Sequence, residues 1–504
     1  MNYSIIFYIV GYVMRIEGAL MLLPLLVDLF YGEDKWYYYL ISSAIAILLG
    51  FLLTAKKPKS NVFYLKEGCV STALSWIALS IFGGIPFFLT GEIPSFINAV
   101  FEVVSGFTTT GASILSDLDT LSHASLFWRS FTHWIGGLGV LVFLMAILPM
   151  TGGSTINLMR AESPGPDVGK LAPHMRETAR ILYYIYMGLT VTMIIILLIT
   201  GMPVFDTLTM SFGTAGTGGF AVRNSGLADY TVLQQNIITV FMILFGVNFN
   251  AFYYIIYRKF KKAWQMEEVR TYFIIILASI TIISFNIINM CDGVWDAIQK
   301  AAFQVGSIIT TTGFSNTDFD LWPSLSKYVL VLLMFCGACA GSTGGGLKVS
   351  RAIMLVKHVG REITSYIHPK NIRKIKFDGA PLSHETVRST TSYFLAYITL
   401  FIVSLFIVSF DGYDFVTNFT GVAATFNNIG PGLAGVGPTQ NFDFFSPVSK
   451  IVMIFDMLAG RLELFPLLIL FNPRIWIEDL THYHHHHHLH HNHHHHNSIN
   501  TNKK

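Results

Sequence analysis

Four glycine-containing segments hold the residues of this sequence that are best suited to binding an ion. Their sequences are FTTTGAS (107–113), GTGGF (216–220), TTTGFS (310–315) and FNNIGPGL (426–433). Main-chain carbonyl oxygens can replace the hydration shell of a cation, and glycine tolerates a positive φ without adding a side chain. The residues that we expect to supply these carbonyls and turns are Thr109, Thr110, Gly111, Thr217, Gly218, Gly219, Thr311, Thr312, Gly313, Asn428, Ile429 and Gly430.

Each of these segments follows a short apolar stretch that is expected to form a short helix. The four stretches are 96–108, 205–214, 295–310 and 413–427. Asp206, Asp296 and Asp414 follow an aromatic residue near the start of three of them, and Asn98 has that place in the first. Asp and Asn favour helix N-termini. We therefore expect four helix C-termini, with their partial negative charge, to point at one axis and favour a cation there.

The alternative is that the four segments are ordinary turns outside the membrane. Dipeptides such as TG and GG are common in loops, so a single segment would not decide between the two interpretations. The same order of short apolar stretch and glycine loop occurs four times, which favours a repeated element at membrane depth.

The composition predicts a membrane protein with several spans. Of the 504 residues, 52% are hydrophobic and 12% are charged, whereas soluble domains have about 25% charged residues. This argues against a soluble enzyme, a disordered protein and a nucleic-acid binder. Ten stretches approach or exceed the roughly 20 apolar residues that cross a bilayer as a helix. They are 3–30, 36–54, 68–90, 121–148, 178–200, 232–257, 270–291, 325–347, 388–410 and 446–471.

Basic residues predict the orientation of the spans. Most lysines and arginines fall in four connecting segments, which are 56–66, 160–180, 258–270 and 348–388. The positive-inside rule places these segments in the cytoplasm. Both termini are then cytoplasmic, and all four short helices enter from the outer side.

A glycine-rich run interrupts the predicted span 325–347. Four of the six residues in 341–346 are glycine, and each costs about 1 kcal/mol relative to alanine in a helix. Unwound backbone at membrane depth is tolerated where it is buried or lines a cavity, so we expect a plug below the axis. Close helix packing by small residues stays open as an alternative. A nucleotide-binding P-loop is excluded because Leu347 stands where that motif requires lysine.

Charged residues within the predicted spans need an explanation. Arg461 lies in the last span, and such a charge is costly and commonly functional. It could help a cation leave, or form a structural pair with Asp456, Glu463 or the carbonyls of the glycine-rich run, and both roles stay open. Three residues that flank the first glycine loop are interpreted as scaffold or mouth charges, namely Glu102, Arg129 and His133.

At these loops the sequence resembles the superfamily of potassium transporters that includes TrkH, KtrB and the plant HKT proteins, and is most similar to the TrkH/TrkG branch. The resemblance covers about residues 1–480. Further matching runs are HWIGGLG (133–139), GSTGGGLK (341–348) and AGRLELFP (459–466). The first two predicted helices match the additional N-terminal pair of the TrkH branch.

The resemblance implies an all-α polytopic membrane fold. Four pseudo-symmetric repeats, each a membrane helix, a pore helix and a second membrane helix, would surround one pore, after two extra N-terminal transmembrane helices. The expected divisions are an N-terminal extension (1–60), repeat 1 (61–160), repeat 2 (161–265), repeat 3 with a gating loop (266–375), repeat 4 (376–480) and a histidine-rich tail (481–504).

The resemblance also implies a function, which is potassium uptake across a bacterial cytoplasmic membrane by channel-like permeation. Potassium would be the transported ion, and no organic cofactor is expected in this chain. The implied partners are a second copy of the chain and a cytosolic TrkA-type regulatory ring that carries a nucleotide, and no nucleic acid is expected. The implied gate residues are Gly341, Ser342, Thr343, Gly344, Gly345, Gly346, Lys348 and Arg461.

The resemblance also bears on the ion that is selected. Glycine at the position of Gly111 goes with potassium selectivity in this superfamily, and serine there goes with sodium transport in some plant members. The second loop has adjacent glycines, and we align Gly219 because Phe220 follows it, as Phe314 follows Gly313.

Other functions were weighed against this one. A sodium transporter, or a potassium transporter coupled to protons or sodium, stays open on the same scaffold. A carrier of an organic solute would need a midplane pocket and commonly ionisable residues there. An enzyme is not expected, because the sequence has no HExxH, GxSxG or paired intramembrane acid motif.

The sequence alone does not decide the role of two hydrophilic segments. The basic segment 348–388 could be a solvated loop, a surface for anionic lipid or a docking surface for the cytosolic ring. The stretch 482–496 holds 12 of the 18 histidines. We interpret it as low-complexity sequence outside the fold. The interruptions at Leu489 and Asn492 favour a natural histidine-rich tail over an expression tag.

Overall fold

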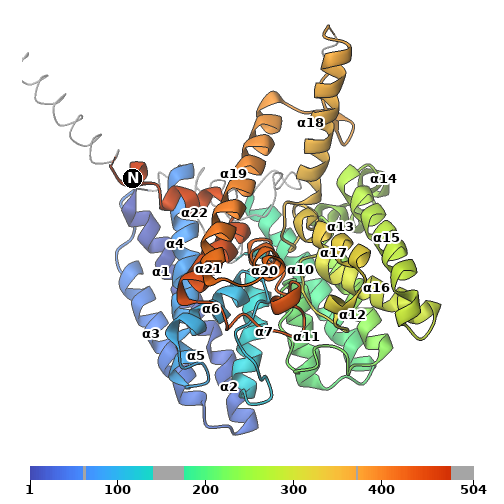
Figure 1. Ribbon diagram of the computed structural model, residues 1–504. Coiled ribbons are helices and arrows are strands. Elements are labelled where there is room, and N and C mark those ends of the chain that lie inside the picture. The colour runs from blue at the N-terminus through green and yellow to red at the C-terminus, as the bar shows by residue number, and fades with distance from the viewer. Residues whose placement is uncertain (61–63, 140–174, 371–372, 478–504) are drawn as a thin grey trace, which may run out of the picture.

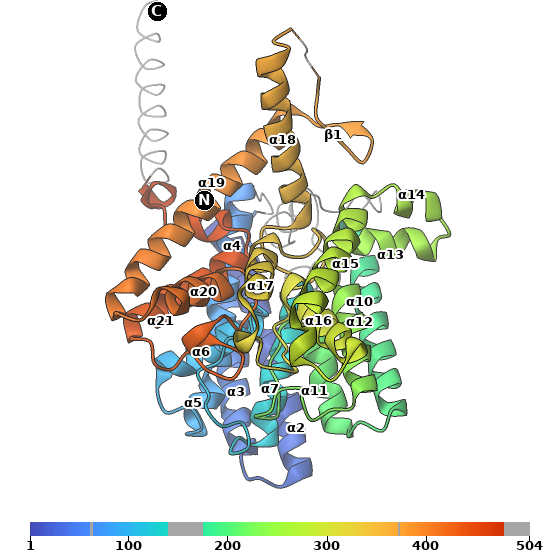
Figure 2. The ribbon, with the colours of Figure 1, turned by 45° about the vertical axis from the view of Figure 1, so that its right-hand side comes forward.

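The computed structural model describes residues 1–60, 64–139, 175–370 and 373–477. Its helices form a bundle in which the N-terminus and α22 (Phe465–Leu470) lie at the same end (Figures 1 and 2). The distal part of the predicted span 121–148, most of the basic segment 160–180 and the histidine-rich tail lie outside the described residues. The expected all-α polytopic fold is confirmed.

The first two spans pack closely against each other before the repeats begin. They comprise α1 (Tyr3–Leu20) with α2 (Leu22–Tyr31), and α3 (Trp36–Thr54). Gly11 of α1 lies so near α3 that an added Cβ would approach Leu53 Cβ to 2.8 Å and the Gly50 carbonyl oxygen to 2.9 Å. Small residues at such crossings let two helix backbones approach closely.

Four repeats follow, each with a short helix between longer elements. Repeat 1 has α4 (Leu65–Gly83), α5 (Ile85–Leu89), α6 (Phe96–Phe107) and α7 (His123–Leu138). Repeat 2 has α10 (Met175–Ile199), α11 (Val204–Ala215), α12 (Val232–Phe245), α13 (Phe249–Ile256) and α14 (Phe260–Trp264).

The second half of the chain repeats this order and adds two projecting helices. Repeat 3 has α15 (Glu267–Ile287), η1 (Ile288–Met290), α16 (Val294–Ile309), η2 (Phe319–Leu321), α17 (Ser324–Cys336) and α18 (Val349–Ile367). A two-stranded antiparallel hairpin follows, with β1 (Lys376–Phe377) and β2 (Ala380–Pro381). Repeat 4 has α19 (His384–Val408), η3 (Ser409–Asp411), α20 (Phe415–Phe426), η4 (Ala434–Val436) and α21 (Pro447–Arg461), followed by α22. Figure 2 shows α18 and α19 extending beyond the bundle.

The four predicted short helices are α6, α11, α16 and α20, and they form the centre of the bundle. Their C-terminal halves are buried, with Phe107, Phe303 and Phe426 in the hydrophobic core. All four residues expected near the helix starts are found there, but in two different positions. Asp414 caps α20 and accepts a hydrogen bond from the Thr417 amide at 3.2 Å. Asp206, Asp296 and Asn98 instead lie inside the first turn of their helices.

Six helices or helix pairs among the described residues are long and apolar enough to cross a membrane, or seven if one bent pair is counted. The prediction of one continuous span over 232–257 is wrong, because α12 and α13 meet at 93°. Asn248 starts α13 by accepting a hydrogen bond from the Asn250 amide at 3.0 Å. The span predicted over 446–471 breaks between α21 and α22, where Glu463 and Leu464 have positive φ.

Candidate functional site

The four glycine loops share one backbone conformation. The first residue of each triplet has a left-handed φ between 56° and 59°, and the third, a glycine, has a φ between 83° and 104°. The middle residue donates its amide N–H back to the preceding helix, for example Thr110 to the Ser105 carbonyl at 2.9 Å and Ile429 to the Ala424 carbonyl at 2.8 Å. Gly219, and not Gly218, is the second-loop glycine with this positive φ.

The four loops stand next to one another in a closed cycle, which we call the loop ring (109–111, 217–219, 311–313 and 428–430). A Cβ added to one glycine would clash with a carbonyl oxygen of the next loop. The clashing pairs are Gly111 with Gly218, Gly219 with Thr312, Gly313 with Ile429, and Gly430 with Thr110. The ring therefore requires glycine at these positions for steric reasons as well as for φ.

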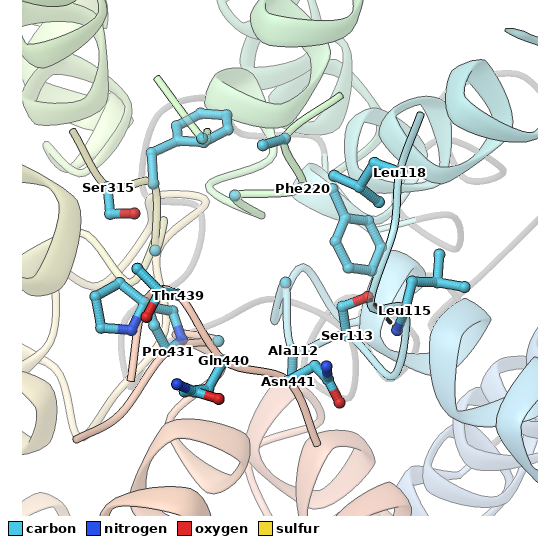
Figure 3. A pocket seen from close by; sticks show the side chains of 18 of the residues that line it. Ala112, Ser113, Leu115, Leu118, Phe220, Ser315, Pro431, Thr439, Gln440 and Asn441 are labelled. Atoms are coloured by element: carbon cyan, nitrogen blue, oxygen red, sulfur yellow. Dashed lines mark hydrogen bonds between the residues drawn. The ribbon is translucent and has the colours of Figure 1, made fainter. Parts of the chain in front are cut away.

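A cavity of about 170 Å³ opens on one side of the loop ring. Its lining includes the four glycines and residues that follow them in the chain, among them Ala112, Phe220 and Pro431. Figure 3 shows side chains from all four loops arranged around this open space. The cavity thus lies on the side to which the chain runs after each glycine.

The glycine-rich loop (337–348) connects α17 to α18 and touches the ring on its opposite side. Thr217 donates its hydroxyl to the Thr343 carbonyl at 2.9 Å, and the Gly345 amide donates to the Thr311 hydroxyl at 2.7 Å. A Cβ on Gly345 would approach the Asn427 carbonyl oxygen to 2.8 Å. These contacts involve residues that precede the ring glycines. The loop therefore lies against three of the four glycine loops, on the face away from the cavity.

Comparison with known proteins identifies the family. Residues 38–477 match the model of the family TrkH, described as cation transport protein. The chain belongs to the TrkH family. It is 36% identical over 486 residues to the Trk system potassium uptake protein TrkH of Salmonella typhimurium, covering 95% of this chain and 100% of that protein. It is 35% identical over 488 residues to TrkH of Escherichia coli K12, again covering 95% and 100%.

A solved structure agrees with this assignment. The potassium transporter TrkH from Vibrio parahaemolyticus superposes with a TM-score of 0.84 at 32% identity, covering 94% of this chain and 100% of that one. The resemblance to TrkH that the glycine loops indicate is therefore confirmed. The match to the family model is what makes this chain a member of a transporter family.

Within this TrkH-family fold, Glu268 connects the first half of the glycine-rich loop to the first turn of α18. The Glu268 carboxylate is buried and accepts hydrogen bonds from the amides of Ala340 at 3.0 Å and Ser350 at 2.7 Å. The Asn248 side chain also donates to it at 3.4 Å. Sequence analysis missed this residue because it stands at the start of a span, where an acid is ordinary. Glu267 stands directly before it, and nothing in the sequence shows which of the two adjacent glutamates is buried.

Arg461 donates hydrogen bonds to the glycines at the end of α7, whereas the sequence suggested the glycine-rich run 341–346 as one candidate partner. Its Nη2 atom donates to the carbonyl oxygens of Gly136 at 2.5 Å and Gly137 at 2.6 Å, near the end of α7. Glu463 pairs instead with Arg351 at 2.5 Å. Lys348 donates to the Gly344 carbonyl within the glycine-rich loop. Cations from three elements are thus gathered near this loop and the end of α7.

Glu102, Arg129 and His133 connect the first two loops. Arg129 Nε lies 3.1 Å from Glu102 Oε2, and Glu102 Oε1 accepts the Ile114 amide at 2.7 Å. Arg129 also donates to the Ala221 carbonyl at 3.1 Å. Because both partners of the ion pair are buried, removing one would leave an uncompensated charge. The pair therefore fixes the chain after Gly111 relative to the chain after Gly219.

Proposed function

We propose that this chain is the potassium-translocating subunit of a Trk-type uptake system, with permeation through the loop ring. The observation that carries the proposal is the cyclic approach of four glycines, each facing a carbonyl oxygen of the next loop. Rings of main-chain carbonyls replace the hydration shell of potassium in selective pores. The relatives are themselves named potassium uptake proteins, which favours potassium as the ion.

The short helices add to the attraction for a cation. α6, α11, α16 and α20 each end immediately before a ring loop. A helix C-terminus carries the equivalent of about half a negative charge. Four such ends lower the energy of a partly dehydrated cation at the ring. Uptake needs no chemical step in this scheme, since a membrane potential supplies about 2.3 kcal/mol per charge for each 100 mV.

The glycine-rich loop is proposed as the gate. It lies across the exit from the ring and is held by hydrogen bonds to Thr217, Thr311 and Glu268. Opening the gate requires these hydrogen bonds to break and others to form. The helix α18, which follows the loop, extends beyond the bundle, where a partner could move it. We propose a cytosolic TrkA-type ring as that partner, a homodimeric assembly, and cytoplasmic termini in a bacterial inner membrane.

The test is ion flux through the purified chain in liposomes. We expect rubidium, as a potassium substitute, to enter under a negative inside potential far faster than sodium does, and the cytosolic ring to change that rate. Equal or faster sodium flux would support a sodium transporter on this scaffold. Flux that stops when a proton or sodium gradient is removed at constant potential would support coupled transport.

A further inference from the structure

The chain between α12 and α15 forms a lateral extension of the bundle, which we call the α13–α14 segment (249–266). The 93° bend after α12 directs α13 away from the axis of that helix. Figure 2 shows α13 and α14 at the outer edge of the bundle, beside the end of α15. α15 begins at Glu267 and is part of a 24-residue candidate span. The segment therefore lies where a membrane helix enters the bilayer.

The α13–α14 segment exposes large apolar side chains. All eight residues from 255 to 262 are exposed, and Phe260 and Trp264 are 60% and 73% exposed. Ile256 and Tyr257 are also more than half exposed. Apolar and aromatic side chains of this kind are favoured in the interfacial layer of a membrane, where the ring or chain enters the lipid.

Four cations are interleaved with these apolar residues. They are Arg258, Lys259, Lys261 and Lys262, and all are exposed. The sequence contains no aspartate or glutamate from 231 to 266, and none of the four forms an ion pair within the part of the chain that the structure describes. Their charge is therefore available to an external anion.

We propose that the α13–α14 segment binds anionic phospholipid, with headgroups on the four cations and acyl chains against Phe260 and Trp264. Long basic side chains can lie along apolar surface and keep the charge at the interface. Clusters of cations beside a membrane span attract acidic headgroups. A water-soluble acidic protein fits less well, because the exposed apolar residues lie at the bilayer edge. The proposal needs only the membrane fold and is independent of the loop ring.

The test uses the full chain in detergent, titrated with phosphatidylglycerol or phosphatidylcholine and read by native mass spectrometry. The variant changes Arg258, Lys259, Lys261 and Lys262 to Gln. A control changes four exposed cations to Gln, namely Lys370, Arg373, Lys374 and Lys376. These follow α18 or belong to β1, which Figure 2 shows beyond the bundle, so we expect them to lie farther from the bilayer than the α13–α14 segment does. We expect the first variant to weaken phosphatidylglycerol binding by about tenfold, with phosphatidylcholine unchanged, and the control to bind as the parent does.

Two results would overturn the proposal. One is equal loss of phosphatidylglycerol binding in both variants, which would mean a general charge effect. The other is unchanged phosphatidylglycerol binding in the first variant, which would indicate that the α13–α14 segment binds a protein partner instead of lipid. As a second readout, brominated phosphatidylglycerol should quench a smaller fraction of the tryptophan fluorescence in W264F than in the parent. The decrease should exceed the one that loss of an average tryptophan would cause. Rubidium flux, measured after the same proteins are reconstituted into liposomes, separates this result from any failure of the transport proposal.

Discussion

His133 of α7 accepts a hydrogen bond from the backbone amide of Phe220, with 3.2 Å between Nε2 and N, although the two residues belong to different repeats. An amide N–H can only donate, so Nε2 carries a lone pair and Nδ1 carries the proton. That proton is donated to the Gly106 carbonyl at 2.7 Å. One neutral, fully buried imidazole thus joins the end of α6 to the residue after Gly219.

The first prediction concerns this connection. His133→Leu removes both hydrogen bonds. The buried Phe220 amide then has no acceptor, at a cost of about 1–3 kcal/mol, whereas the Gly106 carbonyl still accepts the Thr109 amide at 3.1 Å. We expect the second glycine loop to loosen and the potassium-to-sodium permeability ratio in liposomes to fall. His133→Gln keeps one donor and one acceptor and should retain most of the ratio. Equal ratios for the leucine variant and the parent would contradict the prediction.

Gly218 and His133 are expected to depend on each other. A Cβ on Gly218 would clash with the His133 ring, whereas the middle residue of the other loops is Thr110, Thr312 or Ile429. Gly218→Ala alone should therefore reduce rubidium flux strongly. Adding His133→Ala vacates the space, so the double variant should transport better than Gly218→Ala does. Strictly additive losses in the double-mutant cycle would argue against this steric relationship.

Gly111→Ser should lower discrimination between potassium and sodium. Gly111 has φ +83°, and an added Cβ would clash with the Gly218 carbonyl oxygen, so the ring must shift. The left-handed conformation alone costs a non-glycine residue about 1–2 kcal/mol. Gly201→Ser is the matched control, because Gly201 has φ +87° and no atom within 4 Å of an added Cβ. Permeability ratios should change in the first variant only.

Glu268→Ala should raise basal flux. It removes the acceptor for the amide of Ala340 in the glycine-rich loop and for the amide of Ser350 in the first turn of α18. Each amide left unpaired in the interior costs about 1–3 kcal/mol. Glu267→Ala is the control, since that carboxylate pairs with Lys357 at 2.7 Å and is partly exposed. The measurement is rubidium flux without a partner protein. Flux that is unchanged in a folded Glu268→Ala protein would mean that the loop is held elsewhere.

Shortening the glycine-rich loop should have the same direction of effect. Deleting Gly344 and Gly345 removes the hydrogen bond from the Gly345 amide to Thr311 and draws the loop away from the ring. Basal rubidium flux should rise above that of the parent. Thermal unfolding of the detergent-solubilised variant shows whether it is folded. A folded variant with lower flux would contradict the role of this loop as a plug.

The sequence by itself determined the class of fold and the position of the repeated elements. Long apolar runs identify spans because bilayer thickness sets their length, and the short helices with glycine loops are local patterns that occur four times. The sequence also predicts the break in the helix at 337–346, because clustered glycines destabilise any helix that contains them. The family resemblance depends on the same runs, since they carry its motifs.

The tertiary structure decided what these elements contact. The bend after α12 places the Gly246 carbonyl to accept the Cys339 amide at 3.0 Å, a partner almost a hundred residues away that no local pattern reveals. The partners of Arg461 and the hydrogen bond between Phe220 and His133 are likewise set by packing between repeats. Side chains of one type look alike in sequence whether they face lipid, a loop or a neighbouring helix, and only the assembled bundle distinguishes these surroundings.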